Sequence, residues 1–138
     1  MTSPWVLGRP RSGEVVIAVL LTAACSVLAF GLLVILEKPD AKGPSLLAVL
    51  GLVGFVAATP LRRRGAELVS VLLGVMFALV LEFGFLWATS RPNIRAFGPP
   101  DPLSVSLHFV AAALGVFAAF GLVSRAKQDQ RRNPMALE

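Results

Sequence analysis

Glu82 and His108 are the two side chains that could exchange a proton within the apolar parts of this sequence. Glu82 is the one ionisable residue deep inside an apolar stretch, and His108 is the single histidine of the chain. A carboxylate in hydrocarbon costs several kcal/mol unless it is protonated, paired or hydrated. An imidazole titrates near neutral pH, so such a pair can hold or pass a proton. Ser104, one helical turn before His108, could add a hydroxyl.

The positions of these two residues predict that they lie close together. At a rise of ~1.5 Å per residue, Glu82 lies about 10 Å before the end of its apolar stretch and His108 about 8 Å after the start of the next. Each also shares a helix face with small residues, which let helices approach closely in a membrane. These small residues are Ser70, Gly74 and Ala78 beside Glu82, and Ala111, Gly115 and Ala119 beside His108, while Gly51 and Gly54 form a further pair. Such a pair would either handle protons or cations, or form a polar contact that fixes how the helices pack.

Four apolar stretches must position these side chains. They cover residues 15–36, 45–61, 68–89 and 103–124. Each is about long enough to cross a hydrocarbon core of ~30 Å as a helix. We therefore predict an all-α polytopic membrane protein, a single domain of four transmembrane helices in an antiparallel bundle.

The composition argues for the same class of protein. The chain has 138 residues, of which 56% are hydrophobic and only 15% charged, against about 25% charged in soluble domains. The basic residues lie at the ends of the apolar stretches and not among aromatic residues, which argues against a nucleic-acid partner. Neither a Ser-His-Asp set nor a metal-binding His cluster can be assembled, and Cys25 has no second cysteine. We expect no enzyme activity, no metal and no cofactor.

The basic residues also predict an orientation. With four spans, nine of the 13 Lys and Arg residues share one side, which the positive-inside rule assigns to the cytoplasm together with both termini. On that side, Arg62, Arg63, Arg64, Arg125 and Lys127 would anchor the topology or bind anionic lipid heads. Trp5 and Trp87 suit the membrane interface. The predominance of Arg and the absence of Tyr are typical of a GC-rich bacterial genome, so we expect a plasma (inner) membrane.

Part of the sequence resembles a known family. The run Leu79–Thr89, LVLEFGFLWAT, is similar to a segment in the small membrane subunits of tripartite tricarboxylate transporters, and Lys42–Pro44 before an apolar stretch is similar as well. The resemblance implies four spans in a chain of about this length. The second half departs from that pattern, because a proline-rich loop at 90–102 and the stretch with His108 follow, and membership does not follow.

These observations predict a non-catalytic small subunit of a larger bacterial membrane complex for transport or electron transfer. Its partners would be membrane lipids and other integral membrane subunits, and no small-molecule substrate can be assigned. One alternative is a homo-oligomeric carrier or channel for protons or ions that uses Glu82 and His108. A second alternative is a membrane assembly or regulatory factor.

Overall fold

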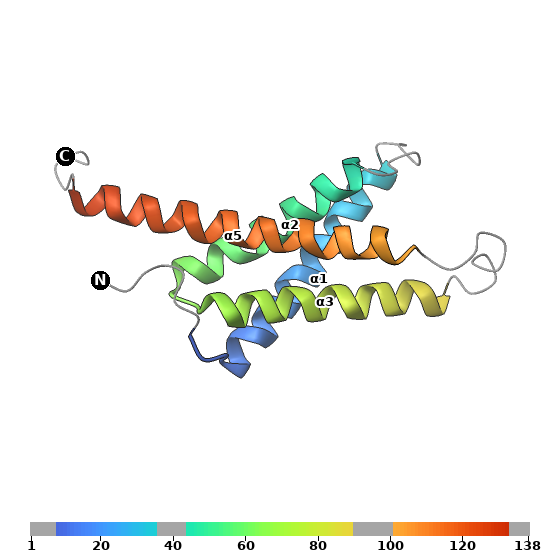
Figure 1. The fold of residues 1–138 in the computed structure, drawn as a ribbon, viewed down its shortest axis with the longest axis horizontal. Helices are drawn as coiled ribbons and strands as arrows, with labels where there is room; N and C mark the ends of the chain where they lie inside the picture. Colours follow the sequence, from blue (N-terminus) through green and yellow to red (C-terminus); the bar gives the residue numbers. More distant parts are fainter. Residues whose placement is uncertain (1–7, 36–43, 90–100, 133–138) are drawn as a thin grey trace.

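The part of the chain that the structure describes folds into four helices. The computed structural model describes residues 8–35, 44–89 and 101–132, and within these ranges the helices are α1 (Ser12–Ile35), α2 (Pro44–Arg63), α3 (Leu68–Thr89) and α5 (Pro102–Arg132). The prediction of an all-α protein is confirmed (Figure 1). The helix α5 continues to Arg132, about two turns beyond the end of the predicted apolar stretch at 124.

Three of these helices are long and apolar enough to cross a membrane. They are α1, over Ser12–Ala29, α3, over Leu68–Phe85, and α5. Within the described residues α2 is not among them, so its crossing stays a prediction. Large apolar side chains are exposed on every helix, for example Leu28 on α1 and Phe85 on α3. Such surfaces suit contact with lipid, where helices satisfy their backbone polar groups internally.

The helices α1 and α3 form one closely packed pair, and they run in the same direction. Near their starts, the backbone N–H of Arg11 donates a hydrogen bond to Ser70 Oγ at 2.9 Å. Further along, Gly74 lies against α1, because a Cβ at this position would be 2.7 Å from the carbonyl oxygen of Val15 and would also meet the side chain of Ala18. The absence of a side chain at Gly74 therefore allows the two helices to approach this closely.

The helices α2 and α5 form the second pair, which is the most extensive contact between two elements. A Cβ at Gly115 would be 2.9 Å from the backbone nitrogen of Phe55, and one at Gly54 would be 3.1 Å from the carbonyl carbon of Ala112. Both contacts are with backbone atoms, which cannot rotate out of the way. Among the described helices, the best-packed neighbours are thus not the ones that follow each other in the chain, and Figure 1 shows α1 and α2 crossing α3 and α5 obliquely.

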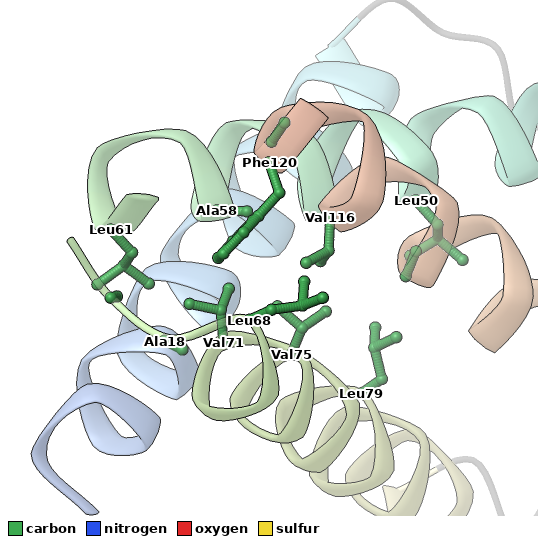
Figure 2. Packing of buried hydrophobic residues seen from close by; sticks show 13 residues of the cluster. Ala18, Leu50, Ala58, Leu61, Leu68, Val71, Val75, Leu79, Val116 and Phe120 are labelled. Carbon is green, nitrogen blue, oxygen red and sulfur yellow. The ribbon is translucent and has the colours of Figure 1, made fainter. Parts of the chain in front are cut away.

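An apolar core joins the two pairs. Phe120 and Val116 of α5 point towards Val71 and Val75 of α3 (Figure 2), and each of these four side chains is fully buried. The core continues through Leu50, Ala58 and Leu61 of α2 and Ala18 of α1. Its larger side chains are branched or aromatic groups that fill the space between the pairs, while glycines allow the close approach within each pair.

The connection between α2 and α3 is a tight reversal with a defined cap. Gly65 has φ +87°, its N–H donates to the carbonyl of Arg62 at 3.0 Å, and the N–H of Ala66 donates to the carbonyl of Leu61 at 3.0 Å. This pair of bonds is the Schellman motif, in which a left-handed residue ends a helix. Because glycine adopts this conformation without a Cβ clash, α3 begins a few residues after α2 ends.

Candidate functional site

Glu82 lies on α3 at the boundary with α1. Its side chain is half-buried, and the polar group near enough to interact with its carboxyl is the hydroxyl of Ser26 on α1. Ser26 itself is only 3% exposed. Among the described residues, neither Glu82 Oε1 nor Ser26 Oγ has a hydrogen-bond partner, although both atoms are buried. Buried polar atoms without a partner are uncommon, since each loses its bonds to water without replacement.

A line of hydroxyl groups on α1 leads to this position. Thr22 lies one turn before Ser26 and is fully buried, and its Oγ1 donates to the carbonyl of Ala18 at 2.7 Å. The spacing of four residues places Ala18, Thr22 and Ser26 on one face of α1. This spacing could have identified a polar face on α1, but not that Glu82 lies against it.

His108 lies on α5 and contacts α3 through aromatic rings. Its ring meets Phe83 edge-on with centroids 5.9 Å apart, and Phe83 stacks on Phe109 at 5.8 Å. His108 Nδ1 donates to the backbone carbonyl of Ser104. A carbonyl oxygen can only accept, so in the neutral imidazole the proton is on Nδ1 and Nε2 is an acceptor. Ser104 thus interacts with His108 through its backbone, and its side chain is exposed.

Whether Glu82 and His108 lie close together depends on which helix each side chain faces. The structure brings His108 to α3 beside Phe83, the residue next to Glu82, while the carboxyl of Glu82 lies near Ser26 of α1. A direct or water-bridged contact between Glu82 and His108 stays a prediction.

The predicted small residues lie between helices of the two parallel pairs. On α3, Ser70, Gly74 and Ala78 are buried, and the first two contact α1. On α5, Gly115 and Ala119 are buried and Ala111 is partly buried, while on α2 Gly54 is buried and Gly51 partly buried. Gly51 and Gly54 meet α5 at the backbone of Ala111 and Ala112.

The basic residues gather where α2 ends beside α5. Arg62 Nη2 donates to Ser124 Oγ at 3.2 Å, and the guanidinium carbon lies 5.0 Å from the centre of the Phe120 ring. The Nε atom of Arg62 is buried and has no hydrogen-bond partner. The other predicted anchors, Arg63, Arg64, Arg125 and Lys127, are exposed. Sequence reasoning did not predict that Arg62 would be held against α5, because Arg62 and its partner Ser124 are far apart in the chain.

Other predicted features can be placed only in part. Trp5 and the side chain of Trp87 lie outside the described residues. Cys25 is a free thiol, half-buried on α1. Over residues 8–35, 44–89 and 101–132, no group of three or more His, Cys, Asp or Glu side chains could hold a metal ion.

Comparison with protein-family models, with curated proteins and with solved structures gives no match for this chain. The function must therefore be argued from the residues and contacts described above.

Proposed function

We propose that this chain is a small multi-pass membrane protein that acts as a non-catalytic subunit of a larger bacterial membrane complex. In this proposal all four helices cross the inner membrane, consecutive helices run in opposite directions, and both termini face the cytoplasm. Three helices of suitable length and composition support the membrane placement. The distribution of basic residues supports the orientation.

The observation that carries the subunit role is the unpartnered polar pair of Glu82 and Ser26. Within the described residues Glu82 Oε1 and Ser26 Oγ are buried without hydrogen bonds, and they lie in the windows of α3 and α1 that are long and apolar enough to span a membrane. Lipid tails offer no donor or acceptor, and the single hydroxyl of Ser26 leaves most of the hydrogen-bonding capacity of the carboxyl for a further partner. A basic or hydroxyl side chain on a helix of another subunit would supply it.

The surface of α1 supports the same proposal. Only 17% of its apolar window is buried within the chain, against 39% for α3. Exposed side chains of α1 include Leu20, Val27 and Leu28. A helix that is covered on one narrow face leaves a broad apolar surface beside Ser26, on which a helix from another subunit could pack.

The test is co-purification from native membranes in a mild detergent, with the partner and its stoichiometry measured by mass spectrometry. We expect a partner in fixed ratio with the natural chain and a reduced yield of it with Glu82→Gln, which removes the charge and keeps the shape. Glu14→Gln is the matched control, because Glu14 already has partners within the chain. A pure homo-oligomer, or equal yields from both variants, would refute the subunit role.

A second candidate function is a homo-oligomeric carrier for protons or small cations. The observation that favours it is also the Glu82–Ser26 pair, whose unpartnered oxygens are suited to a bound cation or a transferable proton. In reconstituted vesicles, Glu82→Gln should then abolish flux driven by an ion gradient. Flux at the level of the natural chain would end this proposal.

A further inference from the structure

We infer that the end of α2 and the adjoining part of α5 bind the phosphate head of an anionic phospholipid, with Arg62 as the central ligand. The inference rests on the membrane placement proposed above but does not require a partner subunit. Four observations carry the inference. They are the fixed position of the Arg62 guanidinium, its unused donors, the unpaired positive charge near Arg62, and the apolar side chains that share helix faces with the neighbouring Arg63 and Arg125.

The guanidinium of Arg62 is held in a defined position. It bonds to Ser124 Oγ at 3.2 Å and lies over the ring of Phe120 at 5.0 Å, and Phe120 is itself fully buried in the core. An arginine over an aromatic face is attracted by the negative charge of the ring. A side chain fixed in this way loses less conformational entropy when it binds an anion than a free one does.

Most donors of this guanidinium remain unused. Arginine has five N–H groups, and Ser124 Oγ accepts from Nη2 only. The Nε atom is buried with no partner, and within the described residues Arg62 forms no ion pair. The planar fork of a guanidinium matches two oxygens of a phosphate, so one phosphate group would satisfy donors that the chain leaves unpaired.

The charge around Arg62 is strongly positive. Arg63 and Arg64 follow it and are exposed, and Arg125 and Lys127 follow Ser124 on α5 and are exposed as well. The described part of the chain gives none of these basic side chains an ion-pair partner. Because the carbonyl end of α2 carries partial negative charge, the anion would be held by arginine side chains and not by backbone groups.

Apolar strips on both helices lead to this charged end. On α2, Leu52, Val56 and Arg63 are exposed and share one face at spacings of four and seven residues. On α5, Leu114 and Arg125 are exposed and also share a face. A strip of apolar side chains that ends in arginine matches an acyl chain that ends in a phosphate, which favours a lipid over a free anion.

The experiment measures lipid binding to the purified chain by native mass spectrometry. Dioleoyl phosphatidylglycerol and dioleoyl phosphatidylcholine are compared, since they share acyl chains and differ in head-group charge. We expect preference for phosphatidylglycerol, a loss of about tenfold in its affinity with Arg62→Gln, and little change with Arg132→Gln, an equal loss of charge at the far end of α5. Inorganic phosphate in excess should not compete.

Three results would overturn the inference. Equal losses from Arg62→Gln and Arg132→Gln would indicate diffuse attraction without a site, equal binding of both lipids would exclude recognition of charge, and competition by inorganic phosphate would indicate a free anion as the ligand. If Arg62→Gln does not fold, the double variant Arg63→Gln with Arg125→Gln replaces it, because both side chains are exposed. Unchanged preference for phosphatidylglycerol in that variant would also refute the site. Neither measurement depends on a partner, so failure here is distinct from failure of the subunit proposal.

Discussion

Gly115→Ala should weaken the packing of α2 against α5 more than any comparable change at an open glycine. A Cβ at Gly115 would lie 2.9 Å from both the backbone nitrogen of Phe55 and the carbonyl carbon of Gly51, and it would be still nearer to the Gly51 oxygen. All of these are backbone atoms of α2, so relief requires that a whole helix move. The contact between α2 and α5 is the most extensive in the protein, so such a shift disturbs many other contacts.

The size of the effect follows from two opposing terms. Overpacking in a well-packed interior costs about 1–3 kcal/mol, and alanine gains about 1 kcal/mol over glycine in a helix. Because backbone atoms cannot rotate away, we expect an overpacking cost in the upper part of this range, about 2–3 kcal/mol, and therefore a net loss of about 1–2 kcal/mol in the free energy of unfolding. The matched control is Gly84→Ala on α3, where nothing lies within 4 Å of the added Cβ, so only the helical gain applies.

The assay follows the reaction of a fluorogenic maleimide with Cys25 during heating in detergent. Cys25 is the single cysteine of the chain, and unfolding exposes this half-buried thiol fully. The midpoint temperature of unfolding should fall by several degrees for Gly115→Ala, and for Gly84→Ala it should stay the same or rise. If Gly115→Ala is as stable as the natural chain, the close approach of α2 and α5 described here is incorrect.

Two further predictions concern the end of the bundle where α1 and α3 begin. Gly65→Ala should lower the free energy of unfolding by about 1–2 kcal/mol, because an L side chain is strained at φ +87°. Gly13 lies in open space, so Gly13→Ala should not destabilise the protein. Equal unfolding midpoints for the two variants in the same maleimide assay would contradict this prediction. Glu14→Ala should cost about 1 kcal/mol, because Glu14 Oε2 accepts from the N–H of Glu67 at 3.0 Å just before α3. Hydrogen exchange at the first turn of α3 should rise with it, and unchanged protection there would show that the cap is not needed.

The positions of the helices could be predicted from the sequence because the signal is local. Continuous apolar stretches end at prolines, glycines and charged residues, and the start of α3 at Leu68 agrees with the prediction. The exact residue at which α5 ends is less clearly marked. Beyond Ser124 the sequence is polar and the helix is exposed up to Arg132, so no hydrophobic pattern marks where it ends.

The neighbours of the polar residues could not be predicted in the same way. Small residues on α3 and α5 indicate that each helix has a close neighbour, but a line of Gly, Ala and Ser is compatible with many partner helices. The expectation rested on consecutive helices, whereas the closest pairs are α1 with α3 and α2 with α5. Ser26 near Glu82 and Ser124 bonded to Arg62 both result from these pairs.

Composition and periodicity were therefore sufficient for the all-α class and the apolar character of the helices. Helix formation in apolar stretches depends on nearby residues, and these can be read along the chain. The pairing of helices depends on which surfaces fit at backbone distance, as at Gly54 and Gly115. That fit depends on the shape of several helices together, so the surroundings of Glu82, His108 and Arg62 became apparent only from the packed bundle.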